Sequence, residues 1–245
     1  MNIFVHFQTI FLTTLLQSGG LSTLPENQMQ ALKIAADSTL KVYLLEAEYE
    51  KKGLINVHTI LSQSHIDIRY SYPDNFLNKD VYGDYCACHL QKDAIVLLEK
   101  AHQYLQEIKA GWTFIFYDCT RPVSVQQKMW DALSHLAPAQ RGKYVSNPRN
   151  HSVHNYGLAI DLGLVNELGE VVDMGTDFDY FGELAYPSAE DRLLKTGKLN
   201  THQVENRRLL RKVMLDAGFR QQAFEWWHYN TYPRSVAKQL YEPVY

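Results

Sequence analysis

The 245-residue sequence contains little cysteine and no dense cluster of basic residues. Its three cysteines, Cys86, Cys88 and Cys119, are too few for the disulfide framework of a small secreted domain. Cys86 and Cys88 are also too close together for a zinc-finger pair, so we interpret each cysteine as a structural thiol. The formal net charge is −3, and the lack of concentrated Lys and Arg argues against a nucleic-acid partner.

Internal repeats, low-complexity stretches and a Gly-rich phosphate loop are also absent from the sequence. The apolar fraction of 46% and the charged fraction of 21% are ordinary for a globular protein that buries a sizeable core. Helix and strand patterns are mixed without a regular βαβ rhythm, which favours an α+β fold. We therefore expect a single domain over residues 25–245, with a mainly antiparallel central sheet flanked by helices.

The N-terminal segment has features of a signal peptide but not all of them. Residues 2–16 form an apolar run, and a stretch of small residues follows that ends at Gly20. The first lysine is Lys33, so the basic start of a signal peptide is missing. We expect residues 1–24 to be a signal peptide or leader of a periplasmic or otherwise exported protein, without stable membrane insertion once the leader is removed. The alternative is a cytoplasmic protein with a disordered or packed leader.

Helices are expected where apolar residues recur at helical spacing, and strands where apolar residues alternate with polar ones. The expected helices cover residues 27–52, 90–109, 122–135 and 203–217. The expected strands cover residues 54–60, 65–70, 112–117, 158–165 and 224–229, with a hairpin turn at residues 167–170.

Two histidines and one aspartate occur in a pattern that indicates a metal site. Gly157 suits a turn between His154 and Asp161, so both side chains can face one cleft. Asp161 interrupts an apolar run, where an ionised carboxylate is unfavourable unless a cation or strong hydrogen-bond donors compensate. A salt bridge or backbone hydrogen bonds are the other explanation. With His228, these residues would give zinc three protein ligands and leave a fourth position for water.

Glu225 lies three residues before His228 in an aromatic segment. Its carboxylate would be a general base for that water. Residues three apart on a regular strand point to opposite faces. A twist or bulge is therefore needed for Glu225 and His228 to reach one metal, unless Glu225 acts on the water from the side. A buried Glu–His pair is the alternative. We place His151 outside the metal site, because the sequence around Pro148 disfavours the helix that would align it with His154.

Arg121 follows the strand expected at residues 112–117 and precedes Pro122, which suits the first turn of a helix. Arginine is always charged and presents planar donors, so Arg121 suits an oxyanion or a substrate carboxylate. The alternative is a surface ion pair with Asp118.

Together these segments resemble a known family. The pattern Ser-x-His-x-x-Gly-x-Ala-x-Asp at residues 152–161, with Glu-x-x-His at residues 225–228, resembles the LAS-type zinc peptidases of the M15 class. Within that class the chain is similar to the D-alanyl-D-alanine dipeptidases of the VanX type. The resemblance covers roughly residues 54–233, and its supporting segments are residues 67–70, 74–76, 118–122, 174–179, 206–208 and 225–229.

The resemblance implies a hedgehog/DD-peptidase-like fold and one Zn²⁺ ion per chain. His154, Asp161 and His228 would bind the zinc. Glu225 would be the general base, and Arg121 would stabilise the tetrahedral oxyanion.

The resemblance also implies a substrate pocket. Asp179 would hold the substrate ammonium, Ser152 would help to fix its carboxylate, and Tyr70 would line the same pocket. The expected activity is hydrolysis of the small dipeptide D-Ala-D-Ala to two D-alanines, which links the protein to peptidoglycan and the cell wall. A D,D-carboxypeptidase or peptidoglycan endopeptidase of the same class is the alternative, and a non-catalytic zinc-stabilised binding domain is a third hypothesis. The oligomeric state and the physiological role stay open.

Overall fold

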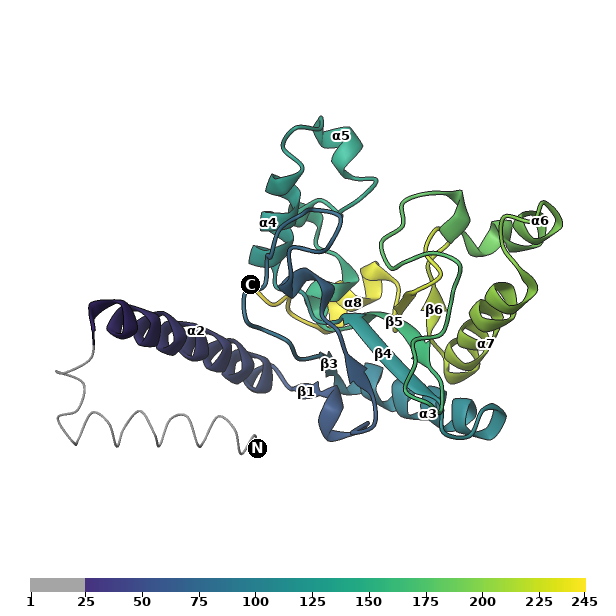
Figure 1. Cartoon of the computed structure of the whole chain (residues 1–245), viewed down its shortest axis with the longest axis horizontal. Coiled ribbons are helices and arrows are strands. Elements are labelled where there is room, and N and C mark those ends of the chain that lie inside the picture. Colours follow the sequence, from purple (N-terminus) through teal and green to yellow (C-terminus); the bar gives the residue numbers. More distant parts are fainter. Residues whose placement is uncertain (1–24) are drawn as a thin grey trace. The chain divides into compact units, whose positions relative to one another are not determined.

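The computed structural model describes residues 25–245 of the chain (Figure 1). The leader expected over residues 1–24 lies outside the described residues. The chain divides into two units after Glu46, and helix α2 (Glu26–Lys51) matches the helix expected at residues 27–52. Within the described part of the chain, no helix is both long enough and apolar enough to cross a bilayer.

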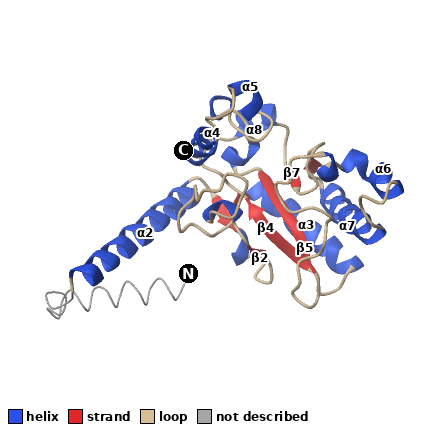
Figure 2. Ribbon diagram, turned by 45° about the horizontal axis from the view of Figure 1, so that its top comes forward, coloured by secondary structure: helices blue, strands red, loops and turns tan. Residues whose placement is uncertain are grey.

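The unit that begins at Ala47 is built around a five-stranded sheet with the strand order β2-β4-β5-β7-β6 (Figure 2). Strand β2 runs parallel to β4, and the other neighbours are antiparallel. The expected mixture of helices and sheet is present, but the sheet is mixed because of this one parallel pair. Its strands are β2 (His65–Ile66), β4 (Thr113–Asp118), β5 (Ala159–Val165), β6 (Arg220–Gln221) and β7 (His228–Asn230). A separate antiparallel pair consists of β1 (Leu54–Asn56) and β3 (His89–Gln91).

Two long helices supply apolar side chains to the core that packs on this sheet. They are α3 (Lys92–Ile108) and α7 (Thr201–Ala217), both close to the ranges expected from their helical periodicity. Among the described residues after Ala47, the other α-helices are α4 (Val123–Ala132), α5 (Pro138–Arg141), α6 (Glu190–Lys195) and α8 (Arg234–Leu240).

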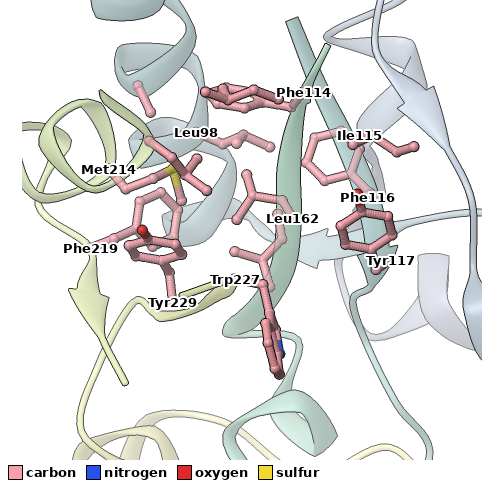
Figure 3. Packing of buried hydrophobic residues seen from close by; sticks show 14 of the residues in the cluster. Leu98, Phe114, Ile115, Phe116, Tyr117, Leu162, Met214, Phe219, Trp227 and Tyr229 are labelled. Atoms are coloured by element: carbon pink, nitrogen blue, oxygen red, sulfur yellow. The ribbon is translucent and has the colours of Figure 1, made fainter. Parts of the chain in front are cut away.

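Alternation along β4 fills both faces of the sheet (Figure 3). Phe114 packs edge to face on the His102 ring of α3, with 6.0 Å between ring centroids. Tyr117, of opposite parity, stacks on Phe178 from the loop after β5, with 5.0 Å between centroids. All residues of β4 and β5 are buried, so the two central strands form a fixed support for side chains at their ends. The same core includes Leu98, Leu162, Met214, Phe219, Trp227 and Tyr229.

The strand expected at residues 224–229 is only partly correct. Regular pairing begins at His228, and the segment before it is irregular. Trp226 and Trp227 are adjacent and both buried, with their rings at 89°, but neither belongs to the paired strand. The strand expected at residues 54–60 also ends early, because the Asn56 side chain accepts a hydrogen bond from the backbone N–H of His58 and starts a 3-10 turn.

Candidate metal centre and substrate pocket

Strand register brings three polar residues side by side at one end of the sheet. Asp118 at the end of β4 pairs with Asp161 on β5, and Asp161 pairs with His228 at the start of β7. Residues that face each other on adjacent strands have Cβ atoms about 4.5–5.5 Å apart. The chain thereby gathers two carboxylates and an imidazole from segments that are distant in sequence.

His154 reaches the same place from the 3-10 turn η5 (Val153–Tyr156), which precedes β5. Gly157 ends this turn in the left-handed conformation, with φ of 69°. A Cβ atom at Gly157 would lie 2.3 Å from a methyl carbon of Leu54, so the turn requires glycine for space as well as for backbone conformation. The expected turn between His154 and Asp161 is therefore present and directs both toward one point.

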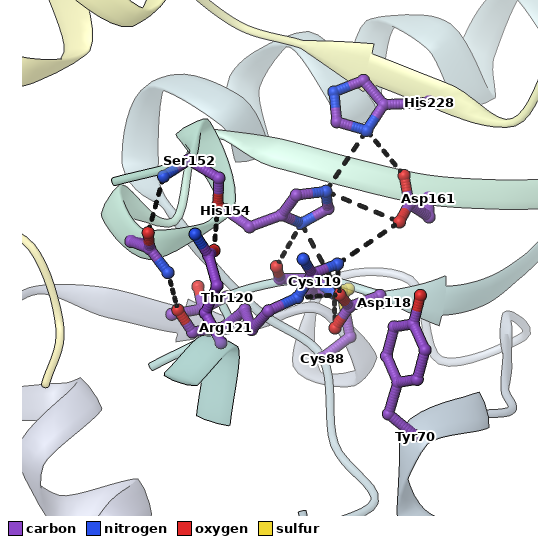
Figure 4. A network of polar contacts seen from close by, with 12 residues as sticks. Tyr70, Cys88, Asp118, Cys119, Thr120, Arg121, Ser152, His154, Asp161 and His228 are labelled. Carbon is purple, nitrogen blue, oxygen red and sulfur yellow. Dashed lines mark hydrogen bonds and ion pairs between the residues drawn. A yellow bond between two sulfur atoms is a disulfide. The ribbon is translucent and has the colours of Figure 1, made fainter. Parts of the chain in front are cut away.

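His154, Asp161 and His228 form a compact group of potential metal ligands (Figure 4). One ligand atom from each lies within 4.8 Å of the other two. Nδ1 of His228 is 2.8 Å from Asp161 Oδ1, and Nε2 of His154 is 3.5 Å from Asp161 Oδ2. Zinc accepts such nitrogen and oxygen ligands.

The hydrogen bonds of both imidazoles fit a bound cation. Nδ1 of His154 donates to the carbonyl of Cys119 at 2.7 Å, and Nε2 of His228 donates to Asn230 Oδ1 at 3.1 Å. These partners leave the lone pairs of His154 Nε2 and His228 Nδ1 facing each other at 3.2 Å. When both imidazoles are neutral, the two facing lone pairs favour a positive charge between them, which a metal ion or a proton on His228 supplies, and outer partners of this kind orient metal-ligating histidines. The donor set therefore fits a zinc ion.

The electrostatics of the group also favour positive charge at this point. Burial opposes ionisation of Asp161, but the two histidines lower the pKa of its carboxyl below the usual range. Burial alone would lower the pKa of His228, but the charges of Asp161 and Glu225 raise it to about 9.

Glu225 lies beside the ligand group rather than within it. Its Oε2 atom is 3.8 Å from Nδ1 of His228. Because residues before His228 are not in a regular strand, Glu225 and His228 can point the same way, which resolves the geometric objection raised by their spacing. Burial raises the pKa of the Glu225 carboxyl, with His228 opposing the rise. A carboxylate with a raised pKa suits proton transfer near neutral pH.

Arg121 is buried and held by Asp118. Its Nε donates to Asp118 Oδ2 at 2.8 Å, and its Nη2 bonds the same oxygen. The other oxygen of Asp118 accepts from the Tyr82 hydroxyl at 2.8 Å and the Cys119 N–H at 3.0 Å. The ion pair that we considered as an alternative therefore exists, but it is buried and fixes the guanidinium. Nη2 of Arg121 lies 4.0 Å from Asp161 Oδ2, so Arg121 also borders the metal group.

Asp179 and Tyr70 line the same cavity as the metal group and contact each other. The Tyr70 hydroxyl donates to Asp179 Oδ2 at 2.6 Å, and the Arg121 guanidinium lies 5.3 Å from the Tyr70 ring centroid. Burial raises the pKa of the Asp179 carboxyl well above its usual range, and Asp161 and Glu225 add to the rise while Tyr70 opposes it. A cation placed beside Asp179 would stabilise the ionised carboxylate and so lower its pKa again.

Ser152 lies in the same region with its hydroxyl already engaged. The hydroxyl donates to Gln126 Oε1 at 2.7 Å. Nε2 of Gln126 donates to the Ser146 carbonyl at 2.9 Å, which fixes the orientation of the amide. To donate to a substrate carboxylate, Ser152 would have to turn away from Gln126.

One cavity of about 410 Å³ connects all the predicted site residues. It is lined by Tyr70, Arg121, Ser152, His154, Asp161, Asp179, Glu225 and His228, together with residues of the rim such as Tyr144, Arg220 and Arg234. The structure thus brings the predicted residues together, whereas His151 bonds the Tyr156 hydroxyl and does not line this cavity.

Sequence reasoning missed several supporting residues. Asn230 could have been predicted as a partner of His228, because residues two apart on a strand share a face and His228 was already a candidate metal ligand. Asp118 was considered as a surface partner of Arg121 and as part of the family-like segment 118–122, but not as the buried residue that fixes the Arg121 guanidinium. Gln126 lies on α4 and gave no local signal of its contact with Ser152.

The interpretation of every cysteine as a structural thiol was wrong for two of them. Cys88 and Cys119 form a disulfide with a Cα–Cα distance of 5.4 Å, and Cys86 is free and exposed. The pairing could not be deduced from spacing, because the antiparallel β1–β3 pair and the end of β4 are brought together only by the fold. The disulfide lies directly beneath the metal group, since the Cys119 carbonyl binds His154.

A largely buried His–Asp–His group with a carboxylate and a guanidinium beside it, on a mixed α/β scaffold, is the active-site arrangement of a metallopeptidase. The family model for M15 peptidases, described as D-ala-D-ala dipeptidase, matches residues 50–243, and the chain belongs to this family. It is 31% identical over 182 residues to a D-alanyl-D-alanine dipeptidase of Escherichia coli (strain K12), covering 72% of this chain and 83% of the relative. It is 37% identical over 191 residues to a D-alanyl-D-alanine dipeptidase of Enterococcus faecium, covering 69% of this chain and 88% of the relative.

Proposed function

We propose that this protein hydrolyses the free dipeptide D-Ala-D-Ala to two molecules of D-alanine, using one zinc ion per chain. The observation that carries the proposal is the position of Asp179, a half-buried carboxylate in the same cavity as the potential metal ligands. A free dipeptide has an ammonium group that Asp179 would bind, and a blocked peptide has none. The names of the relatives, D-alanyl-D-alanine dipeptidases, support this substrate.

His154, Asp161 and His228 would hold the zinc ion. When bound, zinc would polarise the scissile carbonyl and lower the pKa of a neighbouring water. The hydrogen bonds from His154 to Cys119 and from His228 to Asn230 would keep both imidazoles in the required tautomers.

Glu225 would move the proton. Its carboxylate accepts a proton from the attacking water and passes it to the departing amine nitrogen, so that one group acts first as base and then as acid. The raised pKa of Glu225 supports both halves of this transfer, because the protonated form is readily reached.

Arg121 would stabilise the negative charge that develops on the carbonyl oxygen. Asp118 fixes the guanidinium in advance, so little reorganisation is needed when the charge forms. The ammonium would lie between Asp179 and Tyr70, and Ser152 would help to hold the carboxylate after turning from Gln126.

The first test is amine release by zinc-loaded protein from free D-Ala-D-Ala and from an N-acylated peptide that ends in D-Ala-D-Ala. We expect cleavage of the free dipeptide alone, loss of activity after treatment with EDTA, and recovery with zinc. Cleavage of the blocked peptide would indicate a D,D-carboxypeptidase instead. Cleavage of neither substrate would overturn the dipeptidase and leave the endopeptidase or binding-domain alternatives.

We also propose that the protein acts outside the cytoplasm, in a periplasmic or otherwise exported location. The buried Cys88–Cys119 disulfide supports this, because such bonds persist in oxidising compartments and are rare in the cytosol. The test is acid quenching of cells of the natural host, followed by denaturation, alkylation of free thiols and mass spectrometry, because buried thiols react only after the protein is unfolded. Modification of Cys86 alone is the expected result, and modification of both Cys88 and Cys119 would overturn the proposal.

A further inference from the structure

Asp179 lies in the middle of a loop that has no regular secondary structure before η6 (Glu183–Ala185). We call residues 174–184 the substrate loop. Asp179 has a φ of 61°, which is unusual for a residue other than glycine. Such a conformation persists only when the surrounding structure holds it in place. Contacts outside the loop must therefore hold Asp179 in this conformation.

Arg207 on α7 binds both ends of the substrate loop. Its Nε donates to the Met174 carbonyl at 2.5 Å, and its Nη1 donates to the Leu184 carbonyl at 2.7 Å. Asp179 lies five residues from each of these two carbonyls. One guanidinium therefore closes the loop around the residue that faces the substrate pocket.

The environment of Arg207 is unusual for a charged residue. Its side chain is fully buried, and its Nη2 atom has no hydrogen-bond partner. Burial lowers the pKa of the guanidinium to about 10, which still leaves it charged at neutral pH. The nearby Glu190 is engaged by Arg211 through two hydrogen bonds of 2.9 and 2.6 Å. Burying a charge without a direct ionic partner is unfavourable for stability, so the geometry of the loop is the better explanation for this arginine.

Neighbouring side chains of α7 hold the residue just before the loop. Nδ2 of Asn206 donates to the Asp173 carbonyl at 2.9 Å, and Nε2 of Gln203 donates to the Asp173 carboxylate at 2.8 Å. Trp226, the neighbour of Glu225, donates its indole N–H to the Thr176 hydroxyl at 2.8 Å. The loop is thus fixed from α7 and from the segment that carries the general base.

We propose that Arg207, assisted by Asn206, is a positioning residue that presents Asp179 to the ammonium of the dipeptide. We call these two side chains the loop clasp. The inference rests on the proposed role of Asp179, and Arg207 itself does not line the substrate cavity. It acts through the conformation of the loop.

The test is steady-state kinetics of the zinc-loaded full chain with free D-Ala-D-Ala. Arg207→Lys keeps the charge but cannot bind both carbonyls through a planar fork. We expect its KM to rise by about tenfold or more while kcat changes much less, because displaced positioning groups weaken substrate alignment. A purely structural role would lower the amount of active enzyme and leave KM unchanged.

Arg208→Lys is the matched control. Arg208 is the next residue on α7, but it is exposed and pairs with Asp191 at the surface. Its KM should stay within about twofold of the wild-type value. Hydrogen exchange of residues 174–184 should be faster in Arg207→Lys than in Arg208→Lys, which gives a readout independent of activity.

A double-mutant cycle separates this inference from the proposed function. Asp179→Asn should raise KM for the free dipeptide, and Arg207→Lys should add little in that background, since both changes remove the same ammonium contact. If Asp179→Asn leaves KM unchanged, the ammonium role fails and the inference with it. If Asp179→Asn raises KM but Arg207→Lys does not, the proposed function stands and the loop clasp is refuted.

If Arg207→Lys does not fold, Asn206→Ala is the second variant. It removes the bond to the Asp173 carbonyl at the same end of the loop and disturbs the core less, because Asn206 is only partly buried. A KM raised by about threefold with unchanged kcat would support the loop clasp. An unchanged KM would overturn it.

Discussion

Glu225 is the residue on which proton transfer in the proposed reaction depends. We expect Glu225→Gln to lower kcat by about a thousandfold, because the amide keeps the shape of the side chain but cannot accept the proton. The measurement is amine release from D-Ala-D-Ala, with zinc content determined in parallel. Glu205→Gln, an exposed position on α7, is the control and should change nothing. A kcat within about tenfold of wild type, with zinc bound, would contradict the assigned role.

Asp179 should show opposite effects on stability and on activity. Burial raises the pKa of its carboxyl in the folded protein, whereas in the unfolded chain it titrates near about 3.9. At a pH between the pKa of the unfolded chain and the higher pKa of the folded protein, Asp179 is protonated only in the folded state. The free energy of unfolding therefore falls as the pH rises through this range. Asp179→Asn removes this dependence. The variant should be more stable than wild type at about pH 8 and should lose this advantage below about pH 4.

The same carboxylate must be ionised to bind an ammonium group. In the wild type, kcat/KM should therefore fall on acidification, with an inflection above the ordinary range for an aspartate. Urea unfolding across pH and the pH profile of kcat/KM test the two effects separately. If Asp179→Asn is less stable than wild type at about pH 8, the Asp179 carboxylate does not lower the free energy of unfolding, and the stability prediction is wrong.

Individual residues were predictable when their chemistry conflicted with their surroundings. Asp161 and Glu225 stood out because carboxylates are rare in apolar or aromatic segments, and both line the cavity. Arg207 did not stand out, because an arginine in a polar helix pattern gives no sign that the fold will bury it. Gln126 was missed for the same reason, since its partner Ser152 is brought near only by tertiary structure.

At the scale of elements, the Cys88–Cys119 disulfide joins the residue before β3 to the residue after β4, and the Cys119 carbonyl contacts His154 of the metal group. The double change Cys88→Ala and Cys119→Ala should reduce the free energy of unfolding by about 3–4 kcal/mol, because it removes the constraint on a long loop in the unfolded chain. It should also weaken zinc binding by about tenfold, since the Cys119 carbonyl orients His154. Urea unfolding and zinc titration measure the two effects.

Cys86→Ala is the matched control for this prediction, because Cys86 is free, exposed and only two residues from Cys88. It should behave as wild type in both measurements. Equal stability of the double variant and Cys86→Ala under non-reducing conditions would show that the disulfide contributes nothing to the fold.

Elements with strong periodicity were predicted well, and elements defined by tertiary pairing were not. Helices α3 and α7 repeat apolar residues at helical spacing, so their ranges were close to those observed. The segment 224–229 has the composition of a strand, but only the residues from His228 onward pair with β5, so only β7 lies in the sheet. The parallel pairing of β2 with β4 was missed, because strand direction depends on connections that local patterns do not specify.

At the scale of the whole molecule, the site is assembled from one end of the sheet and the segments around it. Tyr70 follows β2, Arg121 follows β4, and His154 precedes β5, while Asp179 comes from the substrate loop and Glu225 from the segment before β7. The site therefore depends on the complete unit from Ala47 to Tyr245.

The end of α2 belongs to this unit through Tyr49. Its side chain is fully buried, its ring lies 5.7 Å from that of Tyr85 and 5.1 Å from that of His89, and its hydroxyl donates to the Thr120 carbonyl at 3.3 Å. Thr120 immediately precedes Arg121. Tyr49 thus supports the backbone that carries the proposed oxyanion contact, although it lies outside the range in which the family pattern was clearest.

A shortened chain that begins at Ala47 should therefore keep kcat/KM for D-Ala-D-Ala within about twofold of the full chain. A chain that begins at Leu54 should lose about 3 kcal/mol or more of unfolding free energy, because removing a buried aromatic side chain leaves a cavity in the core. Tyr49→Ala in the full chain should reproduce that loss, which separates the side chain from the rest of α2. Urea unfolding and dipeptide hydrolysis on the three proteins provide the comparison. Equal stability of the two shortened chains would show that residues 47–53, which include the end of α2, contribute nothing to the unit that holds the site.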